Sequence, residues 1–96
     1  MLKISEDSDG DTVVFILEGS LSGPWVQEFE RAWQTAADGR RCRRMKANLS
    51  AVTFVSREAK ELLERLFLQG ADLFSSDVLT KLIVDAIARK HRRSRK

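Results

Sequence analysis

The sequence predicts an α/β fold, a single domain in which a mixed, mostly parallel β-sheet is covered by helices in the order β-β-α-β-α-β-α. Short apolar runs of strand length alternate along the chain with longer segments whose apolar residues recur every three or four positions. Strands that are joined through helices run parallel, whereas the first two are separated only by a turn. The 96 residues suffice for one core and leave no room for a second.

The first two elements are predicted to be strands that pair as a hairpin. Leu2 and Ile4 alternate with polar neighbours, and residues 12–17 form a β-branched and aromatic run. The continuous apolarity of this second run predicts burial on both faces. We expect the turn between the strands at Asp9-Gly10.

A helix is predicted to begin at Pro24 and to end at Asp38-Gly39. Trp25, Phe29 and Trp33 recur at a spacing of four, which places them on one helical face. This spacing is what packing against a sheet requires. We therefore interpret the tryptophans as core residues and not as a platform for stacking a ligand.

The middle of the chain predicts a strand, a turn and a helix. Residues 45–49 are a short strand candidate, and Ser50-Ala51 is expected to turn the chain into the apolar residues 52–55. Ser56 is placed to cap the clearest helix of the sequence, which Gly70 ends. The apolar positions of this helix are Ala59, Leu62, Leu63, Leu66 and Phe67.

The C-terminal third predicts one more strand and one more helix. Residues 71–74 form a short apolar strand, and Ser75-Ser76-Asp77 is a suitable opening for a helix. The predicted apolar face of that helix, which we expect to pack on the core, consists of Val78, Leu79, Leu82, Ile83, Ala86 and Ile87.

The net charge of +3 combines two regions of opposite sign. The last eight residues, 89–96, hold six of the 17 basic groups and no acidic one, which leaves 11 basic and 14 acidic residues, a net charge of −3, in the rest. We therefore expect a domain over 1–88 and a disordered basic tail over 89–96. No apolar run approaches the length of a membrane span, no signal peptide is recognisable, and the lone Cys42 favours a reducing compartment. The expected location is cytoplasmic.

The sequence contains few residues that could form a catalytic site. The one histidine, His91, lies in the basic tail, and Cys42 has no histidine partner in the predicted body of the domain. Residues 19–23 contain two glycines but lack the lysine of a phosphate-binding loop. The carboxylates at helical spacing are typical of solvated faces. We expect no enzyme activity, no cofactor and no metal site.

Two segments carry a family resemblance. Residues 49–55 (LSAVTFV), followed by a helix start and Leu62-Leu63, resemble the central stretch of STAS domains, the fold of anti-sigma factor antagonists. Residues 17–21 (LEGSL) are similar to the family's second strand and its Gly-x-Leu turn. The resemblance covers roughly residues 2–88. It implies a STAS-like fold and a bacterial, non-enzymatic module that binds proteins, takes part in signalling and regulates transcription.

The sequence departs from the family's phosphorylation motif. Asn48 and Ser56 stand where the resemblance places two aspartates, Arg57 stands at the phosphorylated serine, and Ala59 stands at a glycine. The resemblance therefore implies that the usual serine switch is absent. Ser56 is the remaining candidate phosphoacceptor, although helix capping accounts for it without modification.

Two binding functions follow as alternatives. In the first, a protein partner, such as an anti-sigma factor or a kinase-like regulator, docks over the helix start and the preceding loop. The residues expected to contact it are Ser20, Ser22, Ser56, Arg57, Glu58 and Lys60. In the second, the basic loop 40–46 and the tail 89–96 bind nucleic acid or another anionic surface through phosphate contacts. The residues expected there include Arg40, Arg41, Arg43, Arg44, Arg92 and Arg93.

Overall fold

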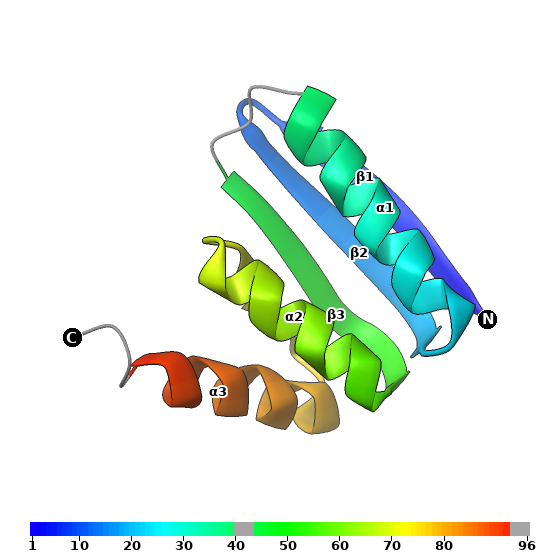
Figure 1. Cartoon of the computed structure of the whole chain (residues 1–96), viewed down its shortest axis with the longest axis vertical. Helices are drawn as coiled ribbons and strands as arrows, with labels where there is room; N and C mark the ends of the chain where they lie inside the picture. Colours follow the sequence, from blue (N-terminus) through cyan, green and yellow to red (C-terminus); the bar gives the residue numbers. More distant parts are fainter. Residues whose placement is uncertain (40–43, 93–96) are drawn as a thin grey trace.

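Four strands form one sheet with the spatial order β1-β2-β3-β4, and three helices accompany it (Figure 1). The computed structural model describes residues 1–39 and 44–92. β1 pairs antiparallel with β2, whereas β2 with β3 and β3 with β4 are parallel. This arrangement confirms the predicted mixed, mostly parallel sheet and its element order. The elements are β1 (Leu2–Asp9), β2 (Thr12–Leu21), α1 (Pro24–Gly39), β3 (Arg44–Val55), α2 (Arg57–Leu68), β4 (Asp72–Phe74) and α3 (Val78–Arg92).

The β1–β2 hairpin turns one residue later than the sequence predicts. Asp9 pairs with Thr12, so the two turn residues are Gly10 and Asp11. Gly10 has a φ of +66° and is the first central residue, which is the position that a type II′ hairpin turn reserves for glycine. The need for a positive φ at Gly10 therefore sets the register of the hairpin.

The burial of β2 alternates along the strand, contrary to the prediction that both of its faces are covered. Phe15 and Leu17 are completely buried, whereas Val14 and Ile16, which point the other way, are only half-buried. The reason is that α1 and α2 lie on the same side of the sheet (Figure 1). The opposite face of the sheet therefore carries partly exposed side chains.

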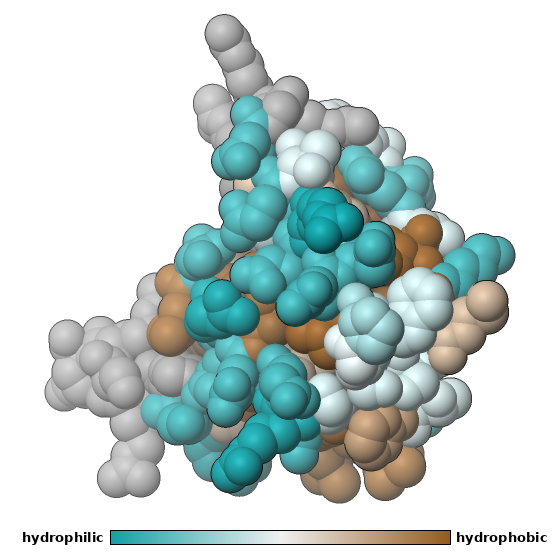
Figure 2. Space-filling model, turned by 45° about the vertical axis from the view of Figure 1, so that its right-hand side comes forward, coloured by the Kyte–Doolittle hydropathy of each residue, from teal (hydrophilic) through white to brown (hydrophobic). Residues whose placement is uncertain are grey.

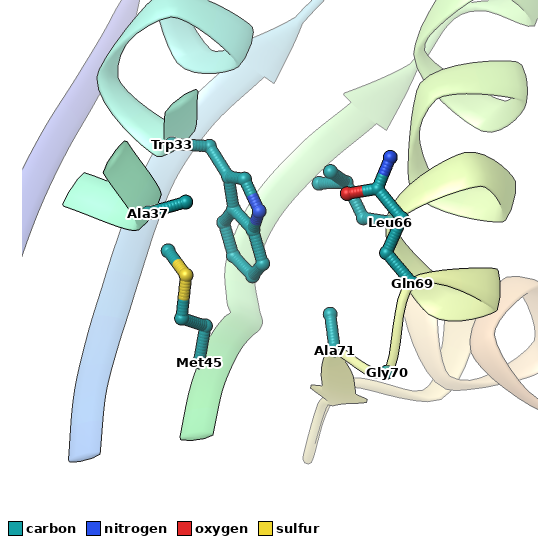
Figure 3. A pocket seen from close by; sticks show the side chains of 7 residues that line it. All are labelled: Trp33, Ala37, Met45, Leu66, Gln69, Gly70 and Ala71. Atoms are coloured by element: carbon teal, nitrogen blue, oxygen red, sulfur yellow. The ribbon is translucent and has the colours of Figure 1, made fainter. Parts of the chain in front are cut away.

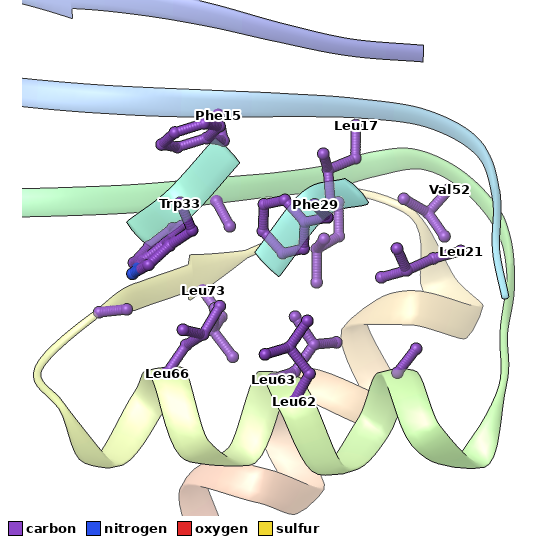
Figure 4. Close-up of a cluster of buried hydrophobic side chains, with 14 of the residues drawn as sticks. Phe15, Leu17, Leu21, Phe29, Trp33, Val52, Leu62, Leu63, Leu66 and Leu73 are labelled. Atoms are coloured by element: carbon purple, nitrogen blue, oxygen red, sulfur yellow. The ribbon is translucent and has the colours of Figure 1, made fainter. Parts of the chain in front are cut away.

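The core lies between the sheet and these two helices (Figure 4). Phe15 of β2 meets Phe29 and Trp33 of α1 with ring centroids 5.9 and 5.3 Å apart, and Phe29 and Trp33 are 5.8 Å apart. Trp33 is 3% exposed, which confirms its predicted core role, whereas Trp25 is half-buried at the edge of the cluster. Leucines of α2 close the other side of the core.

β3 is one continuous strand, so the turn predicted at Ser50-Ala51 is absent. β3 contains one extra residue relative to β2 at two points, between Asn48 and Ala51 and between Val52 and Phe54. The register of the pairing shifts at both points. Such β-bulges keep a strand paired while they change which side chains face inward. The buried residues accordingly occur at unequal intervals, at Ala47, Leu49, Val52 and Val55.

α3 is rotated away from the orientation that its apolar pattern predicts. Val78, Leu79 and Leu82 are more than 60% exposed, whereas Ile87 and the polar Thr80 are buried. The Thr80 hydroxyl donates a hydrogen bond of 3.1 Å to the carbonyl oxygen of Leu49 in β3. This bond fixes the side of the helix that faces the sheet, and four of the six residues of the predicted apolar face, Val78, Leu79, Leu82 and Ala86, are exposed.

The start of α3 agrees with the opening predicted at Ser75-Ser76-Asp77, whereas its end lies beyond the predicted boundary of the domain. Asp77 caps its start, because its Oδ2 accepts from the backbone N–H groups of Leu79 and Thr80 at 3.1 and 3.2 Å. The helix continues to Arg92, so residues 89–92 of the expected tail are helical, and residues 93–96 lie outside the described part. An ion pair of 2.8 Å between Lys90 and Glu64 joins α3 to α2.

Candidate functional site

The C-terminal ends of β2 and β3 meet at one edge of the sheet, at the lower right of Figure 1. Leu21 pairs with Val55, and the backbone N–H of Ser56 donates a hydrogen bond of 3.1 Å to the carbonyl oxygen of Leu21. The loop after β2 and the start of α2 are therefore held side by side, as loops at the carboxyl ends of parallel strands generally are.

The loop after β2 is short and internally bonded. The hydroxyl oxygens of Ser20 and Ser22 lie 2.9 Å apart, within hydrogen-bond distance. The carbonyl oxygen of Ser22 accepts from the backbone N–H of Trp25 at 3.2 Å, and Gly23 has a φ of +59°, which lets the chain turn into α1. Both serines are half-buried, so each presents part of its surface at the edge.

The start of α2 has the cap that the sequence predicts. Ser56 is extended, with φ −75° and ψ 173°, and its Oγ accepts from the backbone N–H of Ala59 at 3.2 Å. Arg57, Glu58 and Lys60 follow with their side chains exposed. The six residues predicted to contact a partner are therefore brought together at one edge of the fold. Phosphorylation of Ser56 stays a prediction.

One residue of this edge, Phe54, was not among the predicted contacts. Its side chain is 56% exposed, and the residue pairs with Ser20 across the two strands. The extra residue Thr53 between Val52 and Phe54 shifts the register, so that Val52 and Val55 face the core and Phe54 faces outward. The sequence signal was the spacing of three between the two valines, which a regular strand with one buried face does not have.

We call this surface the β2–α2 edge, and it consists of Ser20, Ser22, Phe54, Ser56, Arg57, Glu58 and Lys60. Its charges are mixed, and it carries two cations, one carboxylate and one exposed aromatic side chain. Figure 2 shows that hydrophilic side chains cover most of the visible face and that apolar surface reaches solvent at its lower end.

Of the residues of the anionic-surface alternative, Arg44 and Arg92 fall in the described part of the chain, and neither belongs to this edge. Arg44 begins β3 at the opposite end of the sheet, where its backbone N–H donates to the carbonyl oxygen of Asp11 at 3.3 Å. Arg92 is the last residue of α3. Arg40, Arg41, Arg43, Arg93 and the lone Cys42 lie outside the described residues.

Two hollows accompany the helices. One, of about 200 Å³, lies between the end of α1 and the end of α2, where the indole of Trp33 faces the side chain of Gln69 (Figure 3). The other, of about 330 Å³, is a groove between α2 and α3 in which Lys60 and Glu64 face Leu82 and Ile87. Among the side chains that the structure describes, no three of His, Cys, Asp or Glu are grouped to hold a metal ion.

None of the helices described is both long enough and apolar enough to cross a membrane.

Comparisons with known proteins find a solved structure with a similar fold but no matching family. No protein-family model and no curated protein matches the chain. Among the solved structures that match, a chain in a crystal structure of Mglu superposes with a TM-score of 0.59 and 21% sequence identity. The match covers 76% of this chain and 19% of the Mglu chain. The chain therefore shares its fold with a small part of a much longer protein.

Proposed function

We propose that this chain is a non-enzymatic protein-interaction and signalling module that binds a protein partner through the β2–α2 edge. The observation that carries the proposal is Phe54, an aromatic side chain that is 56% exposed at the edge where the predicted contact residues meet. Aromatic side chains are enriched at protein interfaces and frequently supply most of the binding energy. Phe54 would be the apolar anchor, and Arg57, Glu58 and Lys60 would form the polar rim.

The proposed partner is a signalling protein of the kind that anti-sigma factor antagonists bind, namely an anti-sigma factor or a kinase-like regulator in a bacterial cytoplasm. The resemblance of residues 49–55 to STAS domains supports this class. Arg57 places a positive charge near the N-terminus of α2, where the helix dipole favours an anion. A carboxylate of the partner beside Arg57 would satisfy both groups, so we expect an acidic contact surface opposite this helix start.

The test is a binding measurement with matched surface variants. The partner is identified by mass spectrometry after affinity capture, and its dissociation constant is then measured by calorimetry with purified proteins. We expect Phe54→Ala and Arg57→Glu each to weaken binding by at least about tenfold, as interface anchors do. The control for the first is Phe74→Ala, which removes another exposed phenylalanine (41% exposed) from β4. The control for the second is Lys81→Glu on α3, which also reverses an exposed positive charge.

The outcome that contradicts the proposal is a partner whose affinity is the same for Phe54→Ala and Arg57→Glu as for the unaltered protein. The anionic-surface alternative makes a different prediction, because duplex DNA would bind and would lose affinity steeply with salt. Deleting residues 93–96 tests the tail more cleanly than deleting everything after Ala88, since residues 89–92 belong to α3 and Lys90 pairs with Glu64.

A further inference from the structure

The hollow between the end of α1 and the end of α2 has walls from three parts of the chain (Figure 3). α1 supplies Trp33 and Ala37, β3 supplies Met45, and the end of α2 supplies Leu66 and its C-cap residue Gln69. The volume of the hollow is about 200 Å³. The hollow is separate from the β2–α2 edge, because that edge contains the start of α2 and the hollow adjoins its end.

Backbone hydrogen bonds fix the wall at the end of α2. The N–H of Gly70 donates to the carbonyl oxygen of Phe67, and the N–H of Ala71 donates to that of Leu66, both at 3.0 Å. These two bonds form a Schellman motif, in which the chain reverses directly after the helix. The motif returns Ala71 to the side of Leu66 and holds the backbone of Gln69 in place. The side chain of Gln69 therefore starts from a fixed position across the hollow from α1 (Figure 3).

The indole of Trp33 presents a hydrogen-bond donor to the hollow. Trp33 is 3% exposed, and its ring packs against Phe15 and Phe29, which fixes its orientation. Its Nε1 points into the hollow, toward Gln69 (Figure 3). Within the described part of the chain, no atom accepts a hydrogen bond from this N–H. A donor on a side chain buried to this extent costs free energy until an acceptor reaches it.

The walls indicate which kind of molecule fits. None of the described side chains that line the hollow is charged, so a neutral molecule is favoured over an ion, whose burial without a counter-charge is costly. The thioether of Met45 and the side chain of Leu66 offer apolar contacts, and sulfur packs favourably beside an aromatic ring. A cavity of about 150 Å³ holds benzene, so this hollow suits a ligand of roughly six to ten non-hydrogen atoms.

We propose that this hollow binds a small, neutral aromatic carboxamide. The carbonyl oxygen of the ligand accepts from the Trp33 Nε1–H, and the amide N–H of the ligand donates to the side-chain oxygen of Gln69. The aromatic ring of the ligand lies against Met45 and Leu66. A carboxamide is suited to this place because one planar group carries both the acceptor that the indole requires and a donor for Gln69.

Benzamide is the probe for this site, and nuclear magnetic resonance of the ¹⁵N-labelled full chain is the measurement. The chain has two tryptophans, so its spectrum contains two indole N–H signals, and Trp25→Phe identifies the signal of Trp33. We expect benzamide to shift the Trp33 signal downfield and saturably, with a dissociation constant of about 1 mM for so small a ligand, and to leave the Trp25 signal in place.

Benzoate is the matched control ligand, because it has the same ring and nearly the same shape but carries a negative charge. It should bind at least about tenfold more weakly than benzamide, since no cation among the described side chains that line the hollow compensates its charge. Equal binding of the two probes would contradict the proposed neutral amide.

Two variants test the walls. Gln69→Leu removes the carboxamide and should weaken benzamide binding by at least about tenfold. Its control is Gln27→Leu, which removes an exposed carboxamide near the start of α1 and should leave binding unchanged. Ala37→Leu fills the hollow and should abolish the shift. Gln69 and Ala37 are both exposed, so circular dichroism should show an unchanged fold for these variants.

Three results would each overturn the proposal. The first is a Trp33 signal that benzamide leaves in place up to about 10 mM. The second is benzoate binding as tightly as benzamide. The third is an affinity for benzamide that neither Gln69→Leu nor Ala37→Leu lowers.

Discussion

Thr80 offers the sharpest test of how the fold is held together, through the substitution Thr80→Val. Its hydroxyl is buried with 3% residue exposure and donates to the Leu49 carbonyl oxygen, and the Ser75 hydroxyl lies within hydrogen-bond distance of it. Valine has nearly the same shape but cannot form these bonds. The loss is about 1 kcal/mol for the hydrogen bond to Leu49 and about 1 kcal/mol for the hydrogen bond between the Thr80 and Ser75 hydroxyls. We therefore expect a destabilisation of about 2 kcal/mol.

Thermal and urea unfolding, followed by circular dichroism, measure this change. For a domain of this size 2 kcal/mol corresponds to a fall in Tm of roughly 8–16 °C. Thr80→Ser is the matched control, because it keeps the hydroxyl and removes one methyl group, at a cost of about 0.8 kcal/mol. If Thr80→Val is as stable as the unaltered protein, or more stable than Thr80→Ser, the hydroxyl does not anchor α3 and the reasoning fails.

Three further substitutions have expected outcomes that unfolding experiments can check. Ser56→Ala should cost about 1 kcal/mol whereas Ser56→Asp should cost almost nothing, because aspartate caps a helix as well as serine does; equal losses would contradict the cap. Gly19→Ala should lower the free energy of unfolding by about 2 kcal/mol, because Gly19 has a φ of +110° and a Cβ there would overlap the backbone oxygen of Met1. Gly10→Ala is the control and should cost less, because a Cβ at Gly10 meets open space. Leu82→Ala should change the free energy of unfolding by less than about 0.5 kcal/mol, because Leu82 is 62% exposed. Ile87→Ala should lower it by about 2–3 kcal/mol, because Ile87 is only 7% exposed. Similar losses for the two variants would show that α3 faces the sheet differently.

Features with a local cause were predictable from the sequence. The cap at Ser56 depends on a hydrogen bond to a residue three positions away, and the buried stripe of α2 repeats with the helical period. The order of the elements along the chain and the parallel direction of the strands joined through helices followed from their alternation. The meeting of Ser20 and Ser22 with the start of α2 followed from the rule that parallel strands present their carboxyl ends at one edge.

Features with a distant cause were not predictable. The outward orientation of Phe54 depends on a bulge, and a bulge exists only with respect to the strand that β3 pairs with. The orientation of α3 depends on the bond from Thr80 to Leu49, which are 31 residues apart. An apolar period shows that a helix has an apolar face, but it does not show that a polar hydroxyl elsewhere on the helix decides which side turns inward.

The narrow attachment of α3 has a consequence for local unfolding. Thr80, Ile87, the partly buried Ile83 and Val84 and the Lys90–Glu64 ion pair hold this helix, whereas strands β2 and β3 share the long central ladder of the sheet and carry much of the core. Segments with few buried apolar contacts open at a lower free energy than the core does. In native-state hydrogen exchange, the amides of α3 should therefore exchange as one cooperative group, well before those of β2, and each opening would uncover the buried side of the groove between α2 and α3.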